Sequence, residues 1–215
     1  MPFLSTFREM WSPDNHIDNL MPGFTGERIM MMPVELGNLA GVPTQYKRLV
    51  DYLYSMVEAR WQGNIGYLTI DERALADGST LRRSGLHVDG YYKGRCGAWG
   101  GGGTWGSVGN GMFTVSNTSH CRAWLGMVNG EPDDEGGCGE IDLEGLTPYL
   151  FKANTVYWVD GACVHESMPV DKPTNRQFIR LSMPSNGPWF EGYTENPCGI
   201  LPSHDTLPRR AFMDS

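Results

Sequence analysis

The sequence predicts a single, mainly β domain with one or two flanking helices. The chain has 215 residues, which is enough for one domain with a sizeable core. Its 28 glycines and 14 prolines favour many short strands joined by tight turns over a helical bundle. About seven or eight short segments carry the β-branched or alternating apolar residues that are typical of strands.

The domain divides into a core and two covering arms. Residues 1–43 mix Pro, Gly, Met and aromatic residues without sustained periodicity, so we expect an irregular arm laid over the core. The core spans about residues 64–184. Residues 185–215 are again aperiodic and rich in Pro and aromatic residues, and we expect a second covering arm there.

The clearest helix is predicted over residues 44–61, and strands dominate the rest of the core. Thr44 can cap this helix, and apolar side chains follow it at three-to-four spacing. Residues 72–81 are polar and predict a loop or a short helix. We expect residues 112–117 and 121–128 to pair as an antiparallel hairpin around a turn at 117–119. Further strands are predicted at residues 66–71, 141–143 and, twice, within 156–182.

The second strand of the 156–182 stretch has an unusual face. By the period-two rule, Arg176, Phe178, Arg180 and Ser182 share one side, whereas the other side is mostly apolar. A guanidinium beside buried apolar surface costs free energy unless it meets an anion. The strand therefore predicts a pocket that holds a carboxylate or a phosphate.

Three other residues form a candidate metal-binding face. His87 and Asp89 lie two apart, so in an extended segment their side chains project to the same side. His165 lies 78 residues after His87 and can supply a third ligand from a distant strand. Two His and one carboxylate with open positions suit a non-haem Fe(II) that activates O₂.

From Leu86 to Ser182 the chain resembles the Fe(II)/2-oxoglutarate-dependent dioxygenases. Their pattern is His-x-Asp/Glu, a long gap, a second His and, about ten to fifteen residues later, an Arg that is often followed by x-Ser. Here Arg176 lies eleven residues after His165, and Arg180 lies fifteen residues after it, in an Arg-Leu-Ser context. A single His-x-Asp match carries little weight, so the indication comes from the order and spacing of all the parts.

The resemblance implies a fold, an activity and a set of ligands. The fold is a double-stranded β-helix, or jelly roll, with the helix packed outside. The activity is hydroxylation of a C–H bond that is coupled to decarboxylation of 2-oxoglutarate, with O₂ as a substrate. His87, Asp89 and His165 would bind Fe(II). Arg176 first, and Arg180 second, would bind the distal carboxylate of 2-oxoglutarate, with Ser182 beside it.

Other interpretations stay open at this level. His120 can compete with His165 as the third ligand, although no Arg follows it at the expected separation. A cupin-type metal-binding jelly roll that does not use 2-oxoglutarate is one alternative function. A noncatalytic β-sandwich binding module is another.

Several nearby residues can serve such a site. Arg82 and Arg83 directly precede the His-x-Asp motif, and one of them can face an anionic group of the substrate. Tyr67 can assist cosubstrate binding, although a core position is its simpler interpretation. The glycine-rich residues 94–111 suggest a lid that carries Trp99 and Trp105.

Composition narrows the partners and the location. The formal net charge of −8 repels a nucleic-acid backbone and disfavours nucleic-acid binding. Five cysteines without a Cys-x-x-Cys pair predict reduced thiols and a cytoplasmic location. No run approaches eighteen apolar residues, so no membrane segment is expected. A small molecule and a protein side chain are both compatible with the sequence as the substrate.

Overall fold

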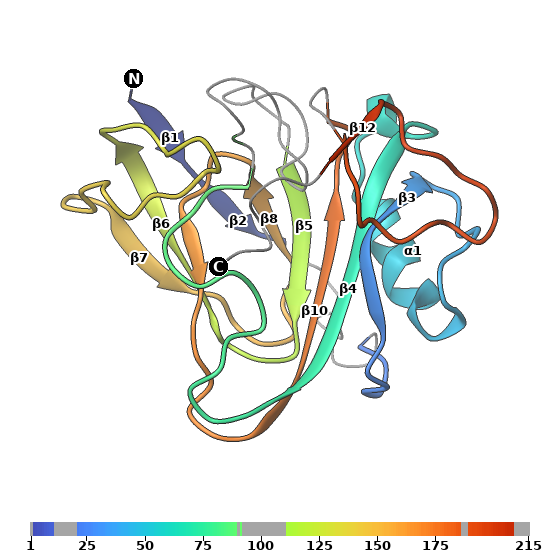
Figure 1. The fold of residues 1–215 in the computed structure, drawn as a ribbon, viewed down its shortest axis with the longest axis horizontal. Coiled ribbons are helices and arrows are strands. Elements are labelled where there is room, and N and C mark those ends of the chain that lie inside the picture. Colours follow the sequence, from blue (N-terminus) through green and yellow to red (C-terminus); the bar gives the residue numbers. More distant parts are fainter. Residues whose placement is uncertain (1, 11–20, 90, 92–110, 186–188, 209–215) are drawn as a thin grey trace.

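The computed structural model describes residues 2–10, 21–89, 91, 111–185 and 189–208. They form two antiparallel sheets and one short parallel strand pair, with little helix (Figure 1). The prediction of a mainly β chain is confirmed. Within this part of the chain, no helix has the length and apolar character that a membrane crossing requires.

The larger sheet has six strands, and β10 lies near its centre. Both edges of β10 are paired, with β4 on one side and β5 on the other. The order across the sheet is β2 (Phe7–Glu9), β8 (Tyr157–Asp160), β5 (Gly111–Ser116), β10 (Thr174–Ser182), β4 (Ile65–Leu75) and β3 (Arg28–Glu35).

The smaller sheet is organised around β6 (Cys121–Val128). One edge of β6 pairs with β7 (Thr147–Leu150). The C-terminal half of β6 also pairs with β1 (Phe3–Ser5), and its N-terminal half pairs with β9 (His165–Ser167). A separate parallel pair joins β11 (Trp189–Phe190) and β12 (Thr206–Leu207).

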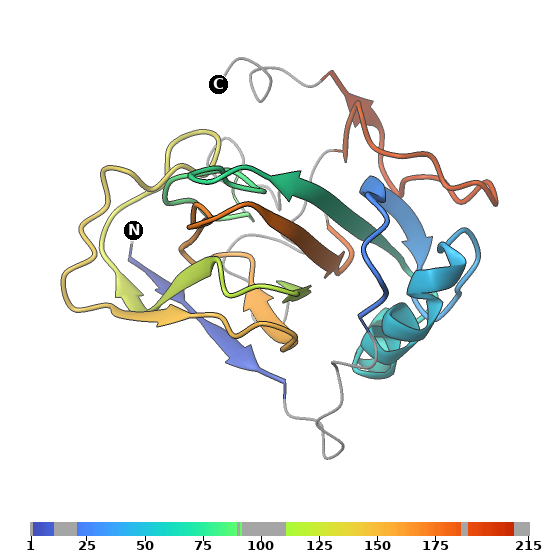
Figure 2. The same cartoon turned by 90° about the horizontal axis from the view of Figure 1, so that it is seen from below.

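A short helical segment covers the outer face of the larger sheet. It consists of the 3-10 turn η2 (Thr44–Tyr46), the helix α1 (Lys47–Ser55) and the 3-10 turn η3 (Ala59–Trp61). The helix is therefore shorter than the predicted range, and no Thr44 side-chain cap forms. In Figures 1 and 2, α1 lies beside β3 and β4. Buried residues from α1 and from the sheet form one core, which includes Leu49, Val50, Leu53, Leu68, Ile70, Ile179 and Leu181.

The predicted hairpin of residues 112–117 and 121–128 is wrong in its pairing, although both strands exist. β5 belongs to the larger sheet and β6 to the smaller one. The connection bonds to other strands instead of closing a hairpin: Asn117 N–H donates to Gln177 O, and the carbonyl of His120 accepts from Met168 N–H. The turn is a corner between the two sheets.

Other predicted segments also differ. The irregular arm predicted for residues 1–43 contains β1, β2 and β3. The strand predicted at 66–71 continues to Leu75, so the expected loop begins later. Residues 141–143 form no strand and lie between two turns, since Ile141 N–H bonds to Cys138 O and Glu144 N–H donates to the Asp142 side chain. His165 begins β9, a separate short strand that a turn at Asp160 divides from β8.

Glu72 connects the helical segment to the sheet. Its buried carboxylate accepts hydrogen bonds from the Tyr46 hydroxyl, from Gln177 Nε2 at 2.6 Å and from Thr25 N–H at 2.7 Å. Burial alone would raise the pKa of Glu72, but these hydrogen bonds outweigh it and lower the pKa to about 2. An ionised Glu72 therefore holds η2, β4, β10 and the segment before β3 together.

Replacing Glu72 with Gln should lower the free energy of unfolding at pH 7 by about 1–3 kcal/mol, because charged hydrogen bonds to buried donors are lost. The folded pKa lies below the unfolded value of about 4.3, so this stabilisation is complete above about pH 4.3 and is lost as the pH falls towards 2. Urea denaturation at pH 7 and pH 3 would measure the difference between wild type and Glu72→Gln, which should shrink at pH 3.

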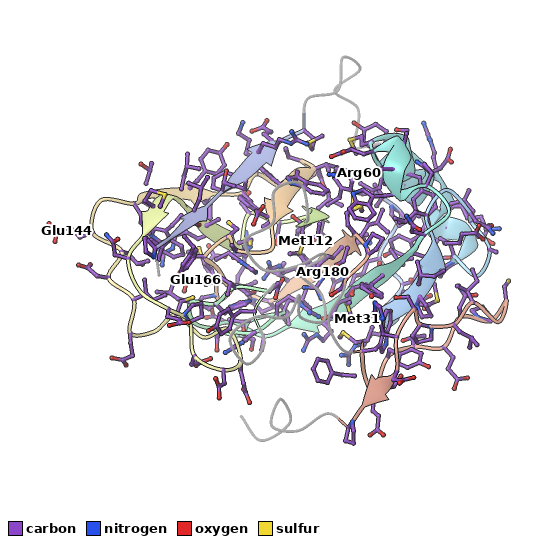
Figure 3. All side chains as sticks on the ribbon, turned by 90° about the horizontal axis from the view of Figure 1, so that it is seen from above. Met31, Arg60, Met112, Glu144, Glu166 and Arg180 are labelled. Atoms are coloured by element: carbon purple, nitrogen blue, oxygen red, sulfur yellow. The ribbon has the colours of Figure 1, made fainter. Side chains whose placement is uncertain are left out.

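The control is Glu144→Gln, since Glu144 is exposed and lies at the periphery of the molecule (Figure 3). It should match the wild type at both pH values. A destabilisation of Glu72→Gln that is equal at pH 7 and pH 3 would contradict the role of the ionised carboxylate.

Candidate metal centre

A cavity of about 800 Å³ lies where the two sheets approach each other. Its walls come from the inner face of β3, β4 and β10, from β9 and from the segment that precedes Tyr91. All three predicted metal ligands and both predicted arginines line it: His87, Asp89, His165, Arg176 and Arg180. The inward face predicted for β10 is confirmed for Arg176, Phe178 and Arg180.

His87 and His165 are joined through their backbones. His87 N–H donates to His165 O, and His165 N–H donates to His87 O, each at 2.9 Å. Such a reciprocal pair in an antiparallel bridge places both side chains on the same side. The two rings accordingly lie 4.4 Å apart between centroids.

Each imidazole is oriented through its Nδ1 atom. His87 Nδ1 lies 2.8 Å from Gly85 O, and His165 Nδ1 lies 2.9 Å from Cys163 O. A carbonyl oxygen can only accept, so Nδ1 carries a proton in both rings and Nε2 is the ring atom that faces the other ligands. Metal-binding histidines are commonly oriented in this way.

Burial, reinforced by the nearby His165, lowers the pKa of His87 to about 3. His87 is thus neutral at pH 7, as a metal ligand must be.

Asp89 completes the group. Its Oδ2 atom lies 3.6 Å from His165 Nε2, and the three ligand atoms all lie within 4.8 Å of one another. Burial would raise the pKa of Asp89, but Arg180 and the two histidines outweigh that effect and hold the pKa well below its usual range. Two imidazoles and one carboxylate so placed can hold a divalent metal ion. Among the described residues, no other group of His, Cys, Asp or Glu meets this criterion.

Arg180 is paired with the metal-binding carboxylate. Its Nη1 donates to Asp89 Oδ2 at 2.8 Å, and its Nη2 lies 3.3 Å from Met31 Sδ. Figure 3 shows Arg180 in the interior, with Met31 nearby. Met31 reaches this position because the pairing of β3 with β4 is irregular between Ile29 and Met32. Arg180 is therefore engaged in positioning Asp89.

Arg176 is the more isolated of the two arginines. Only 1% of its surface is exposed. Its Nη1 donates to Ser167 Oγ and its Nη2 to His120 O, each at 3.0 Å. Its Nε has no partner, and among the described residues no carboxylate hydrogen-bonds to it. A buried guanidinium without a carboxylate is a site that favours an anionic ligand.

Other predicted residues lie elsewhere. Ser182 is fully buried opposite Tyr67 and Met112 and is not among the described residues that line the cavity. His120 is absent from the metal-binding group and contributes its carbonyl to Arg176. Tyr67 packs against Trp189. The predicted lid residues Trp99 and Trp105 lie outside the described residues.

Sequence reasoning missed Asp71 and Arg73, which also line the cavity. Both lie on β4. Thr69, Asp71 and Arg73 are two residues apart, so their polar side chains share one face of the strand, and this pattern could have indicated a polar cavity wall. The strand prediction ended at residue 71, so this signal was not used.

The metal centre predicts that Mn(II) stabilises the protein. At a metal concentration of about 100 times Kd, the free energy of unfolding should rise by about 2.7 kcal/mol, so the melting temperature should rise by several degrees. His87→Ala and His165→Ala should abolish this rise, because each removes one of three ligands.

His120→Ala is the matched control. It lies near Arg176 but leaves the ligand set complete, so it should keep the Mn(II)-dependent rise. Metal content measured after gel filtration would check the same variants. Wild-type metal content in His165→Ala would refute the three-residue centre.

Comparison of the chain with protein-family models, with curated proteins and with solved structures finds no match.

Proposed function

We propose that this protein is an Fe(II)- and 2-oxoglutarate-dependent dioxygenase that hydroxylates a C–H bond of its substrate. The observation that carries the proposal is the combination of two sites in one cavity. One is the His87–Asp89–His165 group, and the other is the buried guanidinium of Arg176. Neither alone would indicate this chemistry.

The donor set fits Fe(II). Two imidazole Nε2 atoms and one carboxylate oxygen on one side of an ion leave the other positions free for ligands. His87, Asp89 and His165, which line the cavity, would hold the ion there. The carbonyls of Gly85 and Cys163 keep both rings oriented, and Arg180 keeps Asp89 ionised.

Arg176 is the better candidate for the distal carboxylate of 2-oxoglutarate. Arg180 already donates to Asp89, whereas Arg176 donates only to a hydroxyl and a carbonyl. Both of these acceptors are neutral, so the charge of Arg176 is uncompensated by them. A carboxylate would provide charge-assisted hydrogen bonds in a region of low dielectric.

The cofactor and the protein would divide the work. Fe(II), when bound, would supply the activation of O₂ that is coupled to oxidative decarboxylation of 2-oxoglutarate. Arg176 would bind and orient the cosubstrate. Phe178 and Met31 would form apolar walls that limit water near the metal.

The proposed architecture is a double-stranded β-helix. Support comes from two antiparallel sheets that both contribute residues to the cavity. The later strands also alternate between the sheets: β7 and β9 lie in the smaller sheet, whereas β8 and β10 lie in the larger one. Such alternation is expected of a jelly roll.

Arg176→Leu tests the proposal. Titration of 2-oxoglutarate into the Mn(II)-loaded protein should give an affinity about 100-fold weaker than the wild type, because two charge-assisted hydrogen bonds are lost. Succinate formation with Fe(II) and O₂ should fall in parallel at subsaturating 2-oxoglutarate. The variant should still bind Mn(II), since its metal ligands are intact.

Arg122→Gln is the control. Arg122 pairs with Glu166, its side chain is 43% exposed, and it does not line the cavity. It should bind 2-oxoglutarate like the wild type. A wild-type protein that binds Mn(II) but neither binds nor converts 2-oxoglutarate would support the cupin-type alternative. A protein that binds no metal would support the noncatalytic β-sandwich.

A further inference from the structure

A second group of arginines surrounds one buried carboxylate in the same cavity. Asp71 is 2% exposed, and it is contacted by Arg28 at 3.5 Å, by Arg73 at 3.1 Å and by Arg82 at 3.1 Å. We call Arg28, Arg73 and Arg82 the outer arginines. All three line the cavity, and none of them belongs to the metal-binding group.

Three separate elements bring the outer arginines together. Arg28 on β3 lies directly opposite Asp71 on β4. Arg73 lies two residues after Asp71 on β4. Arg82 belongs to the segment before the His-x-Asp motif, and its guanidinium lies 5.5 Å from the centroid of the Phe178 ring. Side-chain exposure rises from 23% for Arg82 to 59% for Arg28. The outer arginines therefore extend from the cavity towards solvent.

Asp71 does not require all three cations. Arg73 alone makes a two-pronged contact, with Nε 3.2 Å from Oδ1 and Nη2 3.1 Å from Oδ2. Such a contact satisfies the geometry of a carboxylate. Arg28 and Arg82 add two further positive charges. Within the described part of the chain, Asp71 is the one carboxylate that forms an ion pair with either of them.

Repulsion among the arginines of the cavity also favours an anionic ligand. Arg73 lies directly opposite Arg176 in the β4–β10 pair, and like charges in such positions destabilise a sheet. Arg82 and Arg73 also act to lower the pKa of Arg176, after burial, which is the main cause. Six arginines line the cavity against three carboxylates, so an anionic ligand would relieve this repulsion.

We propose that the outer arginines bind a phosphate group of a small substrate whose reacting carbon lies at the metal. This inference rests on the proposed function and names the class of its substrate. Two positive charges remain after Asp71 is satisfied, and a phosphate monoester carries close to two negative charges at pH 7. A single carboxylate would neutralise only one. A cavity of about 800 Å³ is of the size that holds small-molecule ligands.

The experiment titrates inorganic phosphate into the full chain at low ionic strength and pH 7.5, followed by calorimetry. Malonate, which is also doubly charged, and acetate are titrated in parallel. Each titration is done on metal-free protein and on protein loaded with Mn(II) and 2-oxoglutarate, which would occupy the metal and Arg176.

Arg28→Gln and Arg82→Gln should each weaken phosphate binding about tenfold, because each removes one charged contact. Asp71 keeps two arginine partners in either variant, so both should fold. The matched control is Arg60→Gln, because Arg60 is exposed and pairs with Glu58 outside the cavity. It should bind phosphate like the wild type.

Two results would overturn the inference. One is phosphate binding in Arg28→Gln and Arg82→Gln that equals the wild type. The other is malonate or acetate binding more tightly than phosphate, which would assign the outer arginines to a carboxylate. If the protein does not convert 2-oxoglutarate but still binds phosphate through the outer arginines, only the proposed function is refuted. The titration of metal-free protein does not depend on that function.

Discussion

The register of β10 determines the chemistry of the cavity. β10 is hydrogen-bonded on both edges, to β4 and to β5, so it cannot shift by one residue without breaking two sets of pairs. Ile179 and Leu181 must face the core beneath α1, where both are fully buried. Arg176 and Arg180 then have to face the opposite way, into the cavity. Apolar burial on one face is what forces two guanidiniums into an enclosed space on the other.

Arg176 and Arg180 have different hydrogen-bond partners because they lie at different positions along β10. Arg180 lies where the His-x-Asp segment passes and pairs with Asp89. Arg176 lies nearer to β9 and meets only Ser167 Oγ and the carbonyl of His120. The reciprocal backbone bonds between His87 and His165 fix the segment carrying Asp89 against β9. One backbone bridge therefore assembles the ligand group.

The sequence was informative wherever a local rule applied. Period-two alternation in residues 176–182 predicted the two faces of β10, and the spacing of His87, Asp89 and His165 predicted a group that the fold does bring together. Neither prediction required knowledge of which strands pair. The confirmed features are those that depend on residues two apart or on chain order.

Contacts between residues far apart in the sequence could not be predicted in the same way. Strands β5 and β6 are separated by a turn-like segment that suits a hairpin, yet hydrogen bonds from Asn117 to Gln177 and Asn175 hold it against β10 instead. The early strands β1 and β2 are only three residues long, too short for a periodic signal. The pairing of Arg180 with Asp89 joins residues 91 positions apart, and sequence spacing could not separate its role from that of Arg176.

The charge distribution around the cavity differs from that of the whole chain. The chain carries a net charge of −8, yet the cavity is lined by six arginines and, within the described residues, by no lysine. Screening at physiological ionic strength limits an exposed charge to a range of about 8 Å. A compact anion inside the cavity therefore experiences mainly the nearby arginines and not the net negative charge of the whole chain. Arginine further favours planar or multidentate oxyanions over simple charge neutralisation. The arginine-lined pocket of an otherwise acidic protein thus agrees with the proposed small oxyanionic substrate.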